Sequence, residues 1–195
     1  MPLPSSVSRT KPWLQWVFFA WASVCVVVVS LLMASHLLTL PVPKATPLTV
    51  LSARGSGWRV VHVVAKACGC SQRVLASLLE RGPTTGFAER VLFIGDDPAT
   101  EQRLRATGFD FERVTAASLE ATYDIRGAPL LVVIDPRNEV IYSGGYSSTQ
   151  GGPLRDALVL AEARVGRTVE PMPYFGCAVT PALQKQLDPL SLKYP

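Results

Sequence analysis

Charged residues are scarce in this sequence, and acidic residues are absent from its first part. They make up 17% of the 195 residues, against a usual share of roughly 25%. No Asp or Glu precedes Glu80, so the first 79 residues carry +7 and the remainder −3. The net charge of +4 averages two unlike parts and does not describe a nucleic-acid-binding surface. Four Cys are too few for a disulfide-dense miniprotein, and a hydrophobic content of 48% excludes a disordered chain.

Part of this deficit lies in residues 13–40, which contain no charged side chain. The run exceeds the roughly 20 apolar residues that span a bilayer, and it is about twice as long as the apolar region of a cleavable signal. We therefore predict an uncleaved transmembrane anchor, in which Cys25 is a small apolar side chain. The short tail, residues 1–12, favours a cytoplasmic N-terminus. The rest of the chain would then face the oxidising side of a bacterial inner membrane, the periplasm.

The remaining chain is long enough for one domain with a core of its own. After a Pro-containing linker at 41–57, strand and helix patterns alternate through residues 58–167, and an extension follows at 168–195. Strands are predicted at 59–65, 90–95, 112–115, 130–135 and 140–143, and helices at 72–81, 99–107, 116–123 and 153–165. This order predicts an α/β fold, a mixed central sheet flanked by helices.

Two cysteines, Cys68 and Cys70, separate the first strand from the first helix. A thiol at a helix N-terminus meets unpaired N–H groups that stabilise a thiolate, and Lys66 and Arg73 flank the pair. The acid-free stretch at 41–79 also contains Arg54 and Arg59, and we expect these four basic residues to favour the thiolate. We predict a redox-active dithiol. A structural disulfide, two buried thiols and half of a metal site are the alternatives, because a Cys-x-Cys motif alone is weakly specific.

The strand leading to Cys68-Gly69-Cys70, the segment Arg126-Gly127-Ala128-Pro129 before a strong strand, and the closing hairpin and helix resemble the thioredoxin superfamily. The resemblance covers roughly residues 58–165 and is greatest to the membrane-anchored, periplasm-facing thioredoxin-like proteins of the TlpA/ResA type. It implies thiol–disulfide exchange with protein thiols or disulfides and no cofactor. It also implies that Pro129 is cis and faces Cys68. Without it, Pro129 would be an ordinary trans proline at a strand start.

Two departures from that family bear on the chemistry. The usual motif has two residues between its cysteines, and a smaller disulfide ring is harder to close without strain. A strained disulfide is more oxidising, so we expect an oxidant, an isomerase or a thiol relay. His62 stands six residues before Cys68, where thioredoxins place a buried acid. It could act as a base during exchange, or it could be an ordinary hydrogen-bonded histidine.

Cys177 is the third cysteine after the anchor, so one thiol is unpaired or pairs transiently. It could be a resolving thiol, a metal ligand or a small buried residue. We expect Cys68, as the more exposed cysteine at the helix start, to be the attacking thiolate and Cys70 to resolve the mixed disulfide. The alternative function is copper binding similar to that of the Sco assembly proteins, with Cys68, Cys70, Cys177 and His62 as ligands. Against it, no histidine follows His62.

Overall fold

The computed structural model of the chain describes residues 12–37, 39–44, 57–188, 191 and 194. It divides into two compact units, Met1–Leu38 and Thr39–Pro195. The predicted tail up to residue 11, most of the predicted linker and Arg54 lie outside the described residues.

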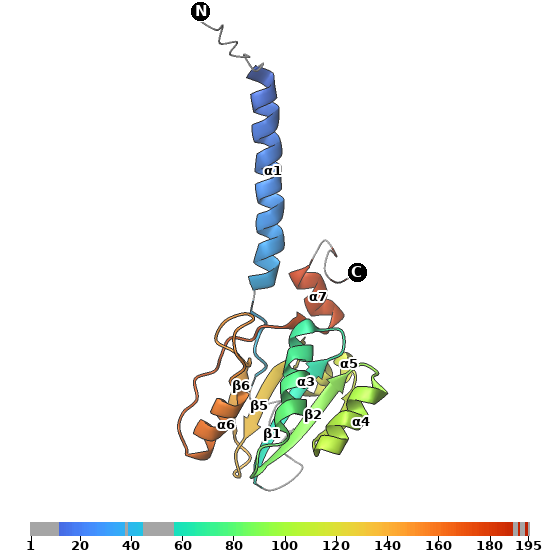
Figure 1. The fold of residues 1–195 in the computed structure, drawn as a ribbon, viewed down its shortest axis with the longest axis vertical. Coiled ribbons are helices and arrows are strands. Elements are labelled where there is room, and N and C mark those ends of the chain that lie inside the picture. The colour runs from blue at the N-terminus through green and yellow to red at the C-terminus, as the bar shows by residue number, and fades with distance from the viewer. Residues whose placement is uncertain (1–11, 38, 45–56, 189–190, 192–193, 195) are drawn as a thin grey trace, which may run out of the picture. The chain divides into compact units, whose positions relative to one another are not determined.

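The first unit contains one long helix, α1 (Pro12–Leu37) (Figure 1). Its segment Pro12–Ser30 is long and apolar enough to cross a membrane. The helix ends at Leu37, before the predicted end of the anchor at Leu40. Leu40 belongs to the second unit instead, where it is buried and donates its backbone N–H to the Tyr174 carbonyl at 2.8 Å.

The second unit is built on a five-stranded mixed sheet with β1 at its centre. Strand β1 pairs in parallel with β2 and antiparallel with β5, while β3 extends the parallel side and β6 the antiparallel side. Strands β1 and β5 are nearly continuous apolar runs because both faces of the sheet are covered. In sheet order the strands are β3 (Asp110–Val114), β2 (Phe87–Ile94), β1 (Trp58–Ala65), β5 (Leu130–Ile134) and β6 (Val140–Gly144).

Helices lie on both faces of this sheet (Figure 1). Apolar side chains of α3, α4 and α6 pack in one core with Val60 and Val64 of β1. Those of α5 and α7 pack in a second core with Val61 and Val63 of the same strand. The predicted mixed α/β fold is confirmed. The helices are α3 (Gly69–Arg81), α4 (Pro98–Thr107), α5 (Ala116–Tyr123), α6 (Asp156–Arg164) and α7 (Pro181–Leu187).

The start of the helix predicted at 153–165 was wrong. The helix predicted from Pro153 begins only at Asp156. The Arg155 N–H donates to the Tyr146 carbonyl at 2.8 Å, and Arg155 has the non-helical φ of −123°. A tertiary hydrogen bond therefore holds the chain out of the helix until residue 156.

A second, two-stranded sheet was not predicted. Strand β4 (Gly127–Ala128) pairs antiparallel with β7 (Cys177–Ala178), which comes from the predicted C-terminal extension. Several extension residues are buried in the two cores, namely Val169, Tyr174, Ala178 and Leu183. The described part of the extension is therefore an integral part of the folded unit.

Candidate functional site

The first cysteine lies between β1 and α3, as predicted. Cys68 is the N-cap residue of α3, with an extended backbone (φ −120°, ψ 115°), and its N–H donates to the Ala65 carbonyl at 3.2 Å. The helix begins at Gly69, earlier than the apolar periodicity suggested, so Cys70 lies in its first turn. The Cys68 thiol is thus attached at the end of the helix where N–H groups lack partners within the helix.

The residue pair Ala128–Pro129 lies beside this thiol. Its peptide bond is cis, as the resemblance implied. In its protonated form the Cys68 thiol donates a hydrogen bond to the Ala128 carbonyl at 3.4 Å, and the two side chains pack together with Ala65. The expected juxtaposition of the first cysteine with the segment at Pro129 is therefore present.

Strand β7 brings the third thiol to the same place. Cys177 is the register partner of Ala128 in the β4–β7 pair, and it packs with Cys70 and Val179 around the cluster that contains Cys68. A Cβ atom on the neighbouring Gly176 would collide with the Ala128 carbonyl oxygen. Only glycine permits so close an approach of the two backbones. All three cysteines are free thiols in this structure.

The exposure of the cysteines differs from the prediction. Cys68 was expected to be the more exposed member of the Cys-x-Cys pair, but only 1% of it is exposed. Cys70 and Cys177 are both half-buried. Cys68 is buried with Ala65 and Ala128, and Cys177 and Val179 of the extension also pack against this cluster.

The pKa of the Cys68 thiol is lowered, although the cause is not the expected one. A hydrogen bond from the Cys177 thiol is the main cause, followed by one from Cys70. These outweigh burial, which alone would raise the pKa of Cys68, and Ser71 lowers it further. Hydrogen bonds to the charged form favour ionisation, so neighbouring thiols favour the Cys68 thiolate.

The basic residues predicted to favour this thiolate have other partners. Lys66 donates to the Asp96 carbonyl at 2.7 Å and Arg73 to the Gly152 carbonyl at 2.9 Å. Arg59, at the start of β1, bonds Asn138. The acid-free stretch of sequence therefore does not supply the leading causes of the shift.

His62 lies in a different network. The side chain is fully buried, with Nε2 2.8 Å from Glu89 Oε2 and Nδ1 2.8 Å from the Tyr146 hydroxyl. His62 projects from the same face of β1 as Val60 and Val64, toward the core formed by α3 and α6. Cys68 packs with Ala65, whose side chain projects from the opposite face of β1. A part for His62 in proton transfer stays a prediction.

This arrangement bears on the copper hypothesis. Both ring nitrogens of His62 have partners, so the structure does not bring this side chain together with Cys68, Cys70 and Cys177 as a ligand set. Within the described ranges, no group of three or more His, Cys, Asp or Glu side chains is placed to hold a metal ion. Copper binding remains a prediction from sequence.

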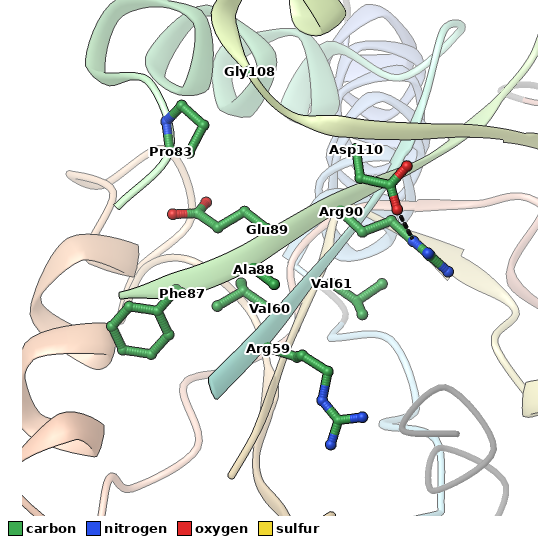
Figure 2. Close-up of a pocket in the computed structure, with 10 residues that line it drawn as sticks. All are labelled: Arg59, Val60, Val61, Pro83, Phe87, Ala88, Glu89, Arg90, Gly108 and Asp110. Carbon is green, nitrogen blue, oxygen red and sulfur yellow. Dashed lines mark hydrogen bonds and ion pairs between the residues drawn. The ribbon is translucent and has the colours of Figure 1, made fainter. Parts of the chain in front are cut away.

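The cavity in Figure 2 does not coincide with the thiols. It has a volume of about 270 Å³ and is lined by residues near the starts of β1 and β2, among them Arg59, Glu89 and Arg90. The cysteines follow the other end of β1. Figure 2 also shows an ion pair between Arg90 and Asp110, two of the lining residues.

Sequence reasoning missed how the extension returns to the site. One glycine pair could have indicated it. Cβ atoms on Gly144 and Gly145 would strike the backbone at Met172 and Pro173, so these glycines make room for the extension. Their spacing carries no information about which segment they receive.

Comparisons with known proteins found similarities in structure alone. No protein-family model and no curated protein matches the chain. A hypothetical protein from Sinorhizobium meliloti 1021 is similar in structure, with a TM-score of 0.51, 15% identity, and coverage of 74% of this chain and 91% of that one. An uncharacterized conserved protein from Geobacillus kaustophilus has a TM-score of 0.48 and 14% identity, over 73% and 90% of the two chains. StoA from Bacillus subtilis has a TM-score of 0.35 and 15% identity, over 46% and 75%.

The class of fold follows from the molecule itself. A central strand leads to cysteines at a helix N-terminus, a cis-proline segment lies beside them, and an antiparallel hairpin and a helix complete the unit. This is the thioredoxin-like fold that the sequence predicted. The additional β4–β7 pair joins the extension to the cysteine end of that fold.

Proposed function

We propose that the protein catalyses thiol–disulfide exchange, with Cys68 as the central thiol and protein thiols or disulfides as substrates. The observation that supports this most strongly is the environment of Cys68. It caps α3, contacts the segment before the cis proline, and has its pKa lowered by two further thiols. The thiolate is the reactive species in such exchange.

The tight Cys-x-Cys spacing supports a role as oxidant, isomerase or thiol relay. A disulfide between Cys68 and Cys70 would close a small ring, and strained disulfides are more readily reduced. The protein would therefore accept electrons from substrate thiols more readily than a strong reductant does.

We place this activity at the outer face of a bacterial inner membrane. Helix α1 supports a single-pass anchor, and an oxidising compartment permits cysteine pairs to form. A membrane-impermeant maleimide should label the cysteines after α1 in intact spheroplasts. Labelling that requires lysis would contradict this orientation.

The function is tested with the full chain in detergent, by insulin reduction with dithiothreitol as electron donor and by refolding of a scrambled disulfide protein. Cys68→Ser should reduce both activities to background. The matched control is Cys25→Ser, in α1, which should keep wild-type activity. Activity that survives Cys68→Ser would refute the proposal.

A further inference from the structure

The C-terminal extension is held firmly across the cysteine site. Residues 172–179, here called the C-terminal strap, make backbone hydrogen bonds along their length. The Met172 carbonyl accepts from Gly145 at 3.1 Å, the Tyr174 carbonyl from Leu40 at 2.8 Å, and Val179 donates to the Arg126 carbonyl at 2.9 Å. The strap is thus an ordered part of the site.

The strap places one particular thiol next to Cys68. Cys177 stands opposite Ala128 in the β4–β7 register, and the Cys68 thiol rests on the carbonyl of that same Ala128. Cys177 packs against the hydrophobic cluster that contains Cys68, and its thiol lowers the pKa of Cys68. Thiols that lie close together on separate backbone segments can form a disulfide without closing the small ring that a Cys68–Cys70 bond requires.

Cys70 is the competing partner for Cys68. It also packs against the cluster that contains Cys68, but only one residue separates the two, and Cys70 is part of the first turn of α3. A Cys68–Cys70 disulfide would have to close its ring across the start of α3. Cys177 lies in β7 and approaches Cys68 from a separate segment of the chain.

We propose that the redox-active disulfide of this protein joins Cys68 to Cys177, and that Cys177 is the sulfur which substrate thiols attack. This proposal rests on the proposed thiol–disulfide exchange at Cys68 and takes Cys177, not Cys70, as its second thiol. A Cys68–Cys177 disulfide has no small strained ring, so its ready reduction rests on Cys68 as a leaving group of low pKa. Cys68 is 1% exposed, while Cys177 is half-buried, so an incoming thiolate reaches Cys177 first.

The exchange balances with a substrate dithiol as reductant. The first substrate thiolate attacks Cys177 Sγ, a bond forms between these two sulfurs, and the Cys68–Cys177 bond breaks. Cys68 leaves as a thiolate, and a thiol of low pKa is the better leaving group. The second substrate thiolate then attacks the substrate sulfur of the mixed disulfide and releases Cys177, which takes up a proton. The substrate loses two electrons and becomes a disulfide, and the protein pair gains them.

Cys70 remains a thiol through this cycle. It donates a hydrogen bond to the Cys68 thiolate and so stabilises the leaving group. A serine hydroxyl can donate the same kind of bond.

The test uses the full chain in detergent, with Cys25→Ser as background so that only the three site thiols remain. Wild-type, Cys70→Ser and Cys177→Ser proteins are reduced and then oxidised by glutathione disulfide, which supplies the two-electron acceptor. Free thiols are alkylated, and the disulfide is located by peptide mapping without reduction. Circular dichroism checks that each variant is folded, and Cys177→Ala and Cys70→Ala replace any serine variant that is not.

We expect wild-type and Cys70→Ser to form the Cys68–Cys177 disulfide, and Cys177→Ser to lose it and to fall at least tenfold in exchange with a dithiol peptide. A Cys68–Cys70 disulfide in wild type, with full exchange by Cys177→Ser, would overturn this inference while leaving the proposed function intact. If none of the three proteins forms a disulfide or exchanges thiols, the proposed function fails as well.

Discussion

Two buried polar clusters are associated with β1, and they differ in nearly every physical respect. The cysteine cluster lies beyond its end and is made of weakly polar thiols beside the C-terminal strap. The second cluster projects into the core of α3 and α6, where Glu89 joins His62 at 2.8 Å and Arg81 at 2.7 Å. Arg81 also binds Asp156 at 3.0 Å. The cysteine cluster contains thiols that can form and exchange disulfides. The Glu89 cluster contains side chains held in place by hydrogen bonds and ion pairs.

This contrast shows how environment separates a reactive site from a structural one. Burial alone would raise the pKa of the Glu89 carboxyl, but hydrogen bonds from His62 and Arg81 outweigh it and hold that pKa well below its usual range. The folded structure therefore favours the ionised form of Glu89. The low pKa of Cys68 instead comes mainly from other thiols, so it supports chemistry among the thiols.

The largest effect on stability is expected in the charged cluster. Glu89→Ala should lower the free energy of unfolding by about 3 kcal/mol or more, because it leaves the buried His62 and the half-buried Arg81 without their shared carboxylate. Urea denaturation followed by circular dichroism measures this loss. Cys68→Ala, which removes a single sulfur atom and leaves no buried charge unpaired, should cost roughly 1 kcal/mol.

The exposed Glu139 supplies the control, since its side chain is 67% exposed and pairs loosely with Arg137. Glu139→Ala should change stability by less than about 1 kcal/mol. A Glu89→Ala protein as stable as this control would show that the second cluster is not a structural one.

The pH dependence of stability should separate the two clusters further. Because the pKa of Glu89 is depressed by folding, its stabilising contribution is complete above the unfolded value near 4.5 and is lost as the pH falls below it. The difference in unfolding free energy between wild type and Glu89→Ala should therefore shrink from pH 5 toward pH 2. A difference that stays constant over this range would contradict the ionic role of Glu89.

The smallest effect is expected at Tyr174, at the base of the strap. The Tyr174 hydroxyl is buried and has no hydrogen-bond partner among the described residues. Tyr174→Phe should therefore leave the unfolding free energy within about 0.5 kcal/mol or raise it, because it removes an unsatisfied group.

Tyr142→Phe is the matched comparison. The Tyr142 hydroxyl donates to the Gly145 carbonyl at 2.6 Å and accepts from the Met172 N–H at 3.3 Å. Its loss should cost about 1 to 2 kcal/mol. Equal losses in the two variants would mean that Tyr174 has a partner in solution.

Much of the fold could be predicted from the sequence because its elements are encoded locally. Apolar runs and turn residues located the strands of the main sheet, and the apolar periodicity after the cysteines located α3. The neighbourhood of Cys68 and Pro129 could be predicted because the resemblance supplied it.

The rest of the site depends on contacts between distant parts of the chain. A two-residue pairing such as β4 with β7 has no periodicity, so neither the position of Cys177 nor the burial of Cys68 could be predicted. The same limit applies to His62, whose spacing from Cys68 suggested a catalytic neighbour. Its partners Glu89 and Tyr146 are contributed by other segments and place it in a separate network.

The most direct test of a redox site centred on Cys68 is a redox titration of the full chain, carrying Cys25→Ser, against glutathione buffers. Thiols are counted with a maleimide mass tag at each potential. Our account predicts one two-electron transition that removes two of the three thiols, and that disappears in Cys68→Ser. Three thiols that stay reduced at every potential, or a transition that persists in Cys68→Ser, would contradict it.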